Sequence, residues 1–176
     1  TFNLPALRGV IYDRNGTILA RNIASYNVVV TAADLPDDPG AIQAIFRELS
    51  DLIGVPVNGG VLDQATNPYV PCISDHGIQQ IAEYGETSSP YLPVKIKCNI
   101  GQSLAMVVQE KATDWPGITV EVEPIRDYPT GSYTANLIGF LGPIPAAQEA
   151  EYRAAGFVPN RDKVGYAGLE LEYNTL

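Results

Sequence analysis

The alternation of apolar and polar residues first becomes regular at residues 8–20, where two short apolar runs flank Asn15-Gly16. This dipeptide favours positive φ at both central positions of a type I′ turn, so the segment predicts a β-hairpin. A β-branched run at residues 26–31 predicts a third strand, which can share one small sheet with the hairpin.

Helical spacing appears next. Apolar residues recur three and four positions apart after Asp38-Pro39 and stop at Gly54, which predicts an amphipathic helix with an acidic cap. Weaker patterns predict helices at 74–85, 104–115, 132–138, 145–155 and 169–176, strands at 69–70, 94–98 and 118–123, and turns at 126–131 and 165–168.

The order of these elements does not alternate as βαβαβ, so it favours an α+β fold over a doubly wound sheet. We expect an elongated arrangement, with a small β-sheet base and an inserted α+β head lobe. Charged turn motifs occur near both ends of the chain, so residues 1–32 and 118–176 are assigned to the base. Residues 33–117 are assigned to the head.

Charge and hydropathy narrow the functional classes. Eleven Lys and Arg against 20 Asp and Glu give a net charge of −9, which disfavours nucleic acid and anionic membrane surfaces. No apolar run approaches the roughly 18 residues that a membrane-spanning helix needs. The chain opens without Met or a signal-peptide pattern and stops within a helical pattern, so we expect a segment of a longer protein.

The two cysteines, Cys72 and Cys98, do not form a metal-ligand motif, and the single His76 lies in a different local setting. We therefore expect no metal ion and no cofactor. Two buried thiols are the simpler interpretation of the cysteines. A Cys72–Cys98 disulfide is the alternative if the protein is extracytoplasmic.

Catalytic arrangements find little support. His76 has no Gly-x-Ser-x-Gly partner motif, so a structural histidine is the better interpretation. Glu121 and Glu123 share one face of a predicted strand, where a solvated face is far more common than a glycosidase pair. Gly165 and Gly168 lack the Gly-Lys-Ser/Thr ending of a phosphate loop and instead indicate tight backbone positions before a helix.

The remaining signal is electrostatic. Arginines and carboxylates cluster near turn glycines in three distant segments. We hypothesise that Arg8 or Arg126 pairs with Asp13 or Glu170, because bidentate Arg–carboxylate pairs orient two segments strongly. The alternative is that each group is an exposed charge worth about 0–1 kcal/mol.

Three ordered motifs together resemble the non-catalytic region of class B penicillin-binding proteins, particularly the elongation type. They are Arg8-Gly9-x-Ile11-x-Asp13-Arg14-Asn15-Gly16-x-x-Leu19-Ala20, Arg126-x-Tyr128-Pro129-x-Gly131 and Gly165-x-x-Gly168-x-Glu170-x-x-Tyr173. In that family the third motif leads into the transpeptidase domain, and the region is called the pedestal or dimerisation domain.

The resemblance implies structural or interdomain roles for the motif residues Arg8, Gly9, Asp13, Arg14, Gly16, Arg126, Tyr128, Pro129, Gly165, Gly168 and Glu170. It implies a position outside the cytoplasmic membrane, anchored by an N-terminal transmembrane helix that lies outside this sequence. The implied partners are the chain's own transpeptidase domain, a polytopic peptidoglycan glycosyltransferase and a rod-shape scaffold protein.

The family's catalytic motifs do not occur in this sequence. No serine has Lys three residues later, Lys-Thr-Gly is missing, and Ser25-Tyr26-Asn27 is a chance match to Ser-x-Asn within a predicted strand. We expect this chain not to be an enzyme, although the full-length protein would be a D,D-transpeptidase. The rival interpretations are a division-type or resistance-type pedestal and a stand-alone carbohydrate-acting hydrolase.

Overall fold

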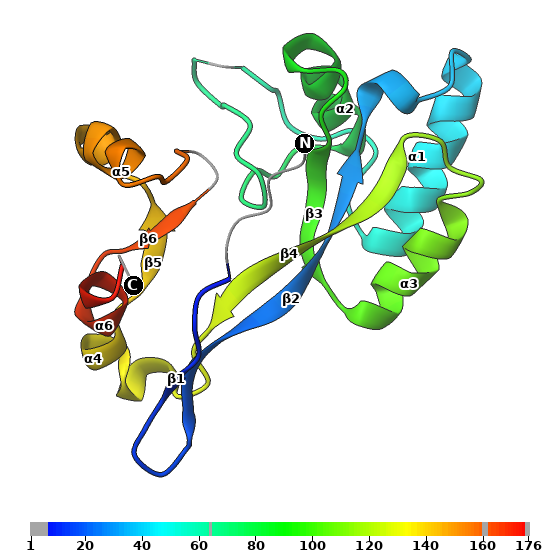
Figure 1. The fold of residues 1–176 in the computed structure, drawn as a ribbon. Helices are drawn as coiled ribbons and strands as arrows, with labels where there is room; N and C mark the ends of the chain where they lie inside the picture. Colours follow the sequence, from blue (N-terminus) through cyan, green and yellow to red (C-terminus); the bar gives the residue numbers. More distant parts are fainter. Residues whose placement is uncertain (1–6, 64, 160–161, 175–176) are drawn as a thin grey trace. The chain divides into compact units, whose positions relative to one another are not determined.

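The computed structural model describes residues 7–63, 65–159 and 162–174 (Figure 1). The predicted lead-in before residue 7 and Leu176 of the predicted final helix lie outside these residues. The described chain is an α+β structure that divides into two compact units, one made by residues 1–23 with 124–176 and the other by residues 24–123.

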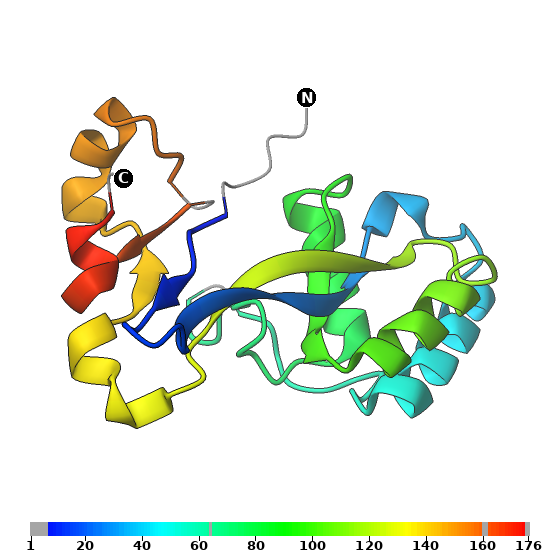
Figure 2. The same ribbon diagram turned by 60° about the horizontal axis from the view of Figure 1, so that its bottom comes forward.

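The unit of residues 24–123 is a sheet covered by helices. Strand β2 (Ile18–Val30) pairs antiparallel with β3 (Val94–Ile100) and also pairs with β4 (Ile118–Asp127). Figures 1 and 2 show α1 (Pro39–Ile53) beside α3 (Gln102–Lys111), with α2 (Ile78–Ser88) next to β3. One apolar core joins these elements, and its fully buried members include Val28, Phe46, Leu49, Ile81, Val108 and Ile118.

Helix α1 forms as its sequence predicts. The Asp38 carboxylate accepts a hydrogen bond from the Ala41 backbone N–H at 2.9 Å, and Pro39 occupies the first turn. Gly54 ends the helix at φ 70°, a left-handed conformation that glycine adopts without steric cost. The buried face of Ile45, Phe46, Leu49 and Ile53 then packs into the core.

The pairing of β2 with β3 is irregular. Its register shifts on both sides of Val28, so β3 carries extra residues opposite β2. At the first shift Asn99 has φ 52°, and its backbone N–H donates to the Asn27 side-chain oxygen at 3.0 Å. The Asn27 amide therefore replaces a backbone acceptor that the bulge removes from the ladder.

The unit of residues 1–23 and 124–176 contains short elements. Strand β1 (Ile11–Tyr12) pairs with the start of β2, and β5 (Leu141–Pro143) pairs antiparallel with β6 (Lys163–Gly165). The short helices of this unit are η2 (Gly131–Tyr133), α4 (Ala135–Ile138), η3 (Ala146–Gln148), α5 (Glu149–Ala154) and α6 (Gly168–Glu172). No helix among the described residues of the chain is long and apolar enough to cross a bilayer.

The predicted type I′ turn is wrong, although the hairpin forms. Gly16 has φ 82° but Asn15 does not have positive φ, and the register shifts beside Tyr12. The Asp13 carboxylate accepts hydrogen bonds from the backbone N–H groups of Asn15 and Thr17, each at 2.8 Å. These bonds lower the pKa of Asp13 and favour a longer turn in which only the glycine is left-handed.

Several predicted boundaries also change. The predicted third strand is the continuation of β2, α2 runs to Ser88 rather than stopping at Gly85, and residues 69–70 form no strand. Helix α2 begins after Gly77, without a side-chain cap from residues 74–75. The sequence did not predict β5 or β6, because three-residue strands carry too little periodicity.

The boundaries between the two units lie within strands, between residues 23 and 24 in β2 and between residues 123 and 124 in β4. The charged motifs suggest boundaries between residues 32 and 33 and between residues 117 and 118. The ends of both strands contribute to the core of residues 24–123, because Val28, Val30 and Ile118 are buried there. The assignment of base and head roles to the two units stays a prediction.

Candidate functional site

A buried carboxylate joins three segments that are far apart in the sequence. Glu170, in the first turn of α6, is 2% exposed. Its Oε2 accepts a hydrogen bond from Arg8 Nη1 at 2.9 Å, and its Oε1 accepts one from Arg126 Nε at 2.7 Å. Both arginine side chains are largely covered, at 21% and 6% exposure. We call this arrangement the Arg8–Glu170–Arg126 clasp.

Each arginine of the clasp also binds backbone oxygen atoms. Arg8 Nη1 donates to the Glu170 carbonyl oxygen at 3.2 Å, and Arg126 Nη1 donates to the Gly9 carbonyl oxygen at 2.8 Å. The planar guanidinium carries five donors in a fixed geometry, so it can satisfy a carboxylate and a carbonyl together. The residues before β1, the end of β4 and the start of α6 are thereby brought together.

Two asparagines that the sequence analysis did not select complete the clasp. The Asn22 side chain donates to the Arg8 carbonyl at 2.5 Å and accepts from Arg126 at 3.4 Å. The Asn174 oxygen accepts from Arg8 and from the Gly165 backbone N–H. Asn174 also donates to the Tyr152 hydroxyl at 3.1 Å. No motif marked these residues, since an isolated asparagine has no distinctive spacing.

The glycines of the third motif permit close backbone contacts. A Cβ added at Gly165 would lie 2.0 Å from the Glu170 carbonyl oxygen, and one at Gly168 would lie 2.4 Å from the Leu137 carbonyl oxygen. Gly168 also has φ 58°. Both positions need glycine because backbone atoms occupy the space of a side chain.

Tyr128 lies at the edge of the clasp, and its hydroxyl donates to Glu170 Oε1 at 3.3 Å. Burial and the neighbouring Glu170 charge together raise the pKa of Tyr128 to about 12, while Arg126 opposes the shift. The tyrosine is therefore a neutral hydrogen-bond donor to the carboxylate over the physiological pH range.

Other predicted motif residues lie outside the clasp. Asp13 caps its own turn and is not a partner of Arg8 or Arg126 in any described ion pair. Arg14 and Pro129 are exposed, and Arg14 makes no ion pair with a described residue. A Cβ added at Gly9 would meet no atom within 4 Å, so the clasp does not require glycine at this position. Gly9 contributes its carbonyl oxygen, which accepts the hydrogen bond from Arg126.

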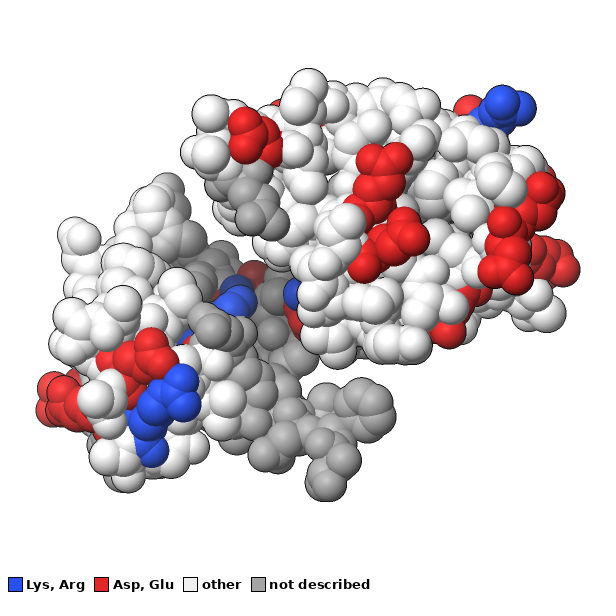
Figure 3. All heavy atoms as spheres, turned by 90° about the horizontal axis from the view of Figure 1, so that it is seen from above, with Lys and Arg blue, Asp and Glu red and all other residues white. Residues whose placement is uncertain are grey.

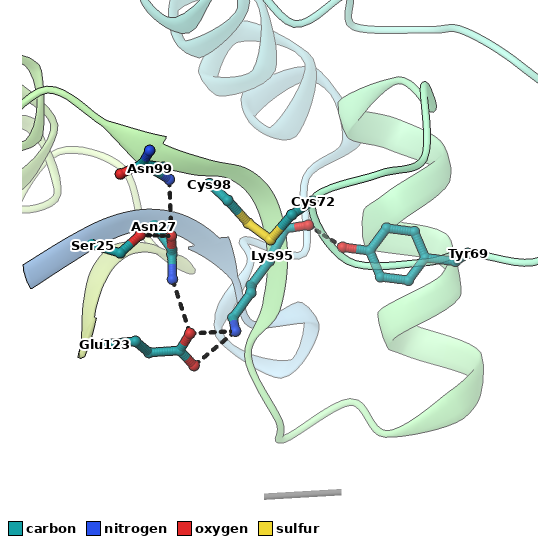
Figure 4. The surroundings of a disulfide bond; sticks show 8 residues. All are labelled: Ser25, Asn27, Tyr69, Cys72, Lys95, Cys98, Asn99 and Glu123. Carbon is teal, nitrogen blue, oxygen red and sulfur yellow. Dashed lines mark hydrogen bonds and ion pairs between the residues drawn. A yellow bond between two sulfur atoms is a disulfide. The ribbon is translucent and has the colours of Figure 1, made fainter. Parts of the chain in front are cut away.

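The unit of residues 24–123 holds a disulfide between Cys72 and Cys98, whose Cα atoms are 5.3 Å apart (Figure 4). The bond links the irregular segment before α2 to the bulge of β3, so the interpretation of the cysteines as two buried thiols is wrong. Tyr69, in the same segment, donates a hydrogen bond to the Lys95 carbonyl oxygen. Burial raises the pKa of Tyr69 to about 12.

Glu123 is not simply a solvated strand residue. Its carboxylate accepts hydrogen bonds from Lys95 Nζ at 2.7 Å and from the Asn27 side chain at 3.2 Å (Figure 4). His76 is buried, and its Nε2 lies 3.3 Å from the Asn67 amide nitrogen. These contacts support structural roles for both residues.

The clasp is suited to rigidity rather than to proton transfer. Both Glu170 oxygens accept hydrogen bonds from guanidinium groups, and the side chain is removed from solvent. A general acid or base must instead be able to reach a substrate proton. No group of His, Cys, Asp and Glu among the residues described could hold a metal ion.

Comparison with known proteins supplies the functional context. A family model described as the penicillin-binding protein dimerisation domain matches residues 3–176. Among curated relatives, the peptidoglycan D,D-transpeptidase MrdA of Acinetobacter baumannii is 23% identical over 98% of this chain and 22% of its own length. The probable peptidoglycan D,D-transpeptidase PenA of Neisseria gonorrhoeae is 29% identical over 78% of this chain and 19% of its own length.

Solved structures share the fold. A Helicobacter pylori penicillin-binding protein, PBP2, in complex with MreC superposes with a TM-score of 0.61 and 16% identity, covering 97% of this chain and 28% of that chain. Penicillin-binding protein 2B of Streptococcus pneumoniae gives a TM-score of 0.56 and 17% identity, covering 96% of this chain and 34% of that one. The chain thus spans about a fifth of the length of the two curated relatives above.

Proposed function

This chain belongs to the penicillin-binding protein dimerisation domain family, and we propose that it is the non-catalytic pedestal of an elongation-type peptidoglycan transpeptidase. In this role it positions a penicillin-binding catalytic domain and docks partners of cell-wall synthesis. The observation that carries the proposal is that the family model spans nearly the whole chain, while the chain spans only about a fifth of its transpeptidase relatives.

The clasp supplies a physical basis for a positional role. A carboxylate shared by two guanidinium groups fixes the direction of α6 relative to the residues before β1 and the end of β4. A domain that follows Glu170 along the chain would inherit this direction. The pedestal thus acts through geometry, and the chemistry belongs to the domain that it carries.

Partners and location follow from the same proposal. The Helicobacter pylori neighbour was solved with MreC, which supports a rod-shape scaffold protein as a partner of this chain. A polytopic peptidoglycan glycosyltransferase is the second partner that we propose. The Cys72–Cys98 disulfide agrees with an extracytoplasmic position, since disulfides persist in oxidising compartments.

A full-length protein containing this chain provides the test. We expect Glu170→Gln to reduce crosslinking of newly polymerised glycan while leaving acylation of the transpeptidase serine by fluorescent penicillin intact. Loss of crosslinking without loss of acylation is the signature of a positional defect. Asp127→Asn, which affects the more exposed Arg21–Asp127 pair of the same unit, is the matched control and should leave both readouts unchanged.

Two results would contradict the proposal. A transpeptidase domain that crosslinks equally well without residues 1–176 would exclude a positioning role. Covalent penicillin labelling of the 176-residue chain by itself would contradict the non-catalytic assignment, because labelling requires an activated nucleophile. Turnover of peptidoglycan fragments by the same chain would favour the stand-alone hydrolase. Complementation of elongation-deficient and division-deficient strains by the full-length protein decides between the elongation-type and division-type pedestals.

A further inference from the structure

An open groove of about 530 Å³ lies between α1, α2 and η1 (Ala32–Asp34). Phe46 and Ala82 form its buried floor, and half-buried Leu35 and Ile42 line its wall. The volume is within the range of about 300–1,000 Å³ that is typical of ligand pockets. A groove of this volume with an apolar floor can accept one bulky apolar side chain of a partner.

The rim of this groove is acidic. Asp37, Glu83 and Glu86 line it and are exposed, and no Lys or Arg is among the described lining residues. None of the three forms an ion pair within the described chain. In contrast, Glu48 and Glu123 of the same unit pair with lysines. Figure 3 shows that Asp and Glu predominate on the surface carrying α2 and the start of α1.

The two glutamates of the rim destabilise helix α2, on which both lie. Glu83 and Glu86 are three residues apart on α2, where like charges lie side by side and repel. Glu86 is in the last turn, beside the negative end of the helix dipole. A cationic group placed over this turn would relieve both effects, so the unbound helix is electrostatically complementary to a cation.

We propose that this groove is a docking site for a protein segment that carries a bulky apolar side chain flanked by Lys or Arg. The apolar residue contacts the floor, and the basic residues pair with the rim. The inference rests on the proposed docking function and adds a location and a partner chemistry to it. Nucleic acids and anionic membrane surfaces do not fit, because the rim would repel their phosphates.

Fluorescence anisotropy with three short synthetic peptides tests the proposal on the 176-residue chain. The first peptide has one central Leu flanked by Lys, the second has Glu in place of every Lys, and the third has Ser in place of the Leu. We expect only the first to bind, with affinity that falls as salt increases. Ala33 is an exposed lining residue of the groove, so Ala33→Trp adds a bulky ring there and should abolish binding while leaving the urea midpoint of the chain unchanged.

Charge-neutralising variants separate the rim from the general acidity of the chain. Glu83→Gln with Glu86→Gln should weaken binding about fivefold, since two exposed pairs contribute roughly 0.5 kcal/mol each. Glu110→Gln with Asp114→Asn removes the same charge from exposed positions outside the groove. It should change the affinity less than about twofold.

Failure of the first peptide to bind, equal binding by the Glu peptide, or equal effects of the two double variants would overturn the docking site. None of these results would alter the crosslinking and acylation outcome for Glu170→Gln. Failure of the groove and failure of the pedestal function are therefore distinguishable.

Discussion

Neutralising Glu170 tests the clasp most directly. In Glu170→Gln the side chain keeps its size, so no cavity forms, but the negative charge is lost. Arg126, at 6% exposure, then remains as an uncompensated buried cation. Arg8 at 21% exposure retains some access to water. Its loss of a partner should therefore cost less.

Breaking a buried ion pair by removing one partner costs about 3–5 kcal/mol. The partial solvation of Arg8 favours the lower limit, so we expect the free energy of unfolding to fall by about 3 kcal/mol. In urea, with a slope of about 2 kcal/mol per molar, the midpoint should decrease by about 1.5 M. Far-UV circular dichroism during urea unfolding measures this shift.

Two further variants make the result specific. Asp127→Asn breaks the pair with Arg21, which is 47% exposed, and should cost no more than about 1 kcal/mol. Adding Arg126→Met to Glu170→Gln removes the stranded cation, so the double variant should be less destabilised than the sum of the two single variants. If Glu170→Gln shifts the midpoint no more than Asp127→Asn does, the clasp is not a stabilising element.

Three other predictions follow from single features. Cys72→Ser should lower the free energy of unfolding by about 3 kcal/mol under oxidising conditions, because the bond to Cys98 closes a loop of sequence separation 26. Dithiothreitol should cause the same loss of stability in the wild-type chain and have no effect on the variant. Gly165→Ala should lower the free energy of unfolding by more than about 2 kcal/mol, because the added Cβ would lie 2.0 Å from a carbonyl oxygen. Gly9→Ala places its Cβ in open space and should change the free energy of unfolding by no more than about 0.5 kcal/mol. Thermal unfolding of the two variants makes the comparison. Folding raises the pKa of Tyr128 from 10 to about 12, so the stability that its protonated hydroxyl contributes is complete below pH 10 and is lost as pH rises toward 12. Tyr128→Phe should reduce this loss of stability at alkaline pH. In a titration followed by tyrosinate absorbance, the variant should show one fewer group that titrates late.

Elements whose determinants are local could be predicted from the sequence. Helix α1 has its cap, its first-turn proline, its apolar spacing and its terminating glycine within one short stretch, and the structure reproduces it. The alternating patterns of β3 and β4 were likewise predicted, although both strands extend further than their patterns. The charged motifs pointed to Arg8, Arg126 and Glu170 because arginines and carboxylates occurred near turn glycines in distant segments.

Features that depend on long-range contacts could not be read from the sequence. Strands β5 and β6 exist because Leu141 and Gly165 meet across a long separation in the chain. The sequence offered both Asp13 and Glu170 as carboxylate partners. In the folded chain the Asp13 carboxylate accepts hydrogen bonds within its own turn, and the Glu170 carboxylate binds Arg8 and Arg126.

The sequence by itself determined the α+β class, the boundaries of α1 and the residue types that could form a clasp. Only the tertiary structure decided which carboxylate the arginines share, that Asn22 and Asn174 complete the clasp, and that Cys72 and Cys98 are joined. The physical reason is distance along the chain. Caps, turns and helical spacing act over a few residues, whereas a buried ion pair or a disulfide depends on how separate segments pack.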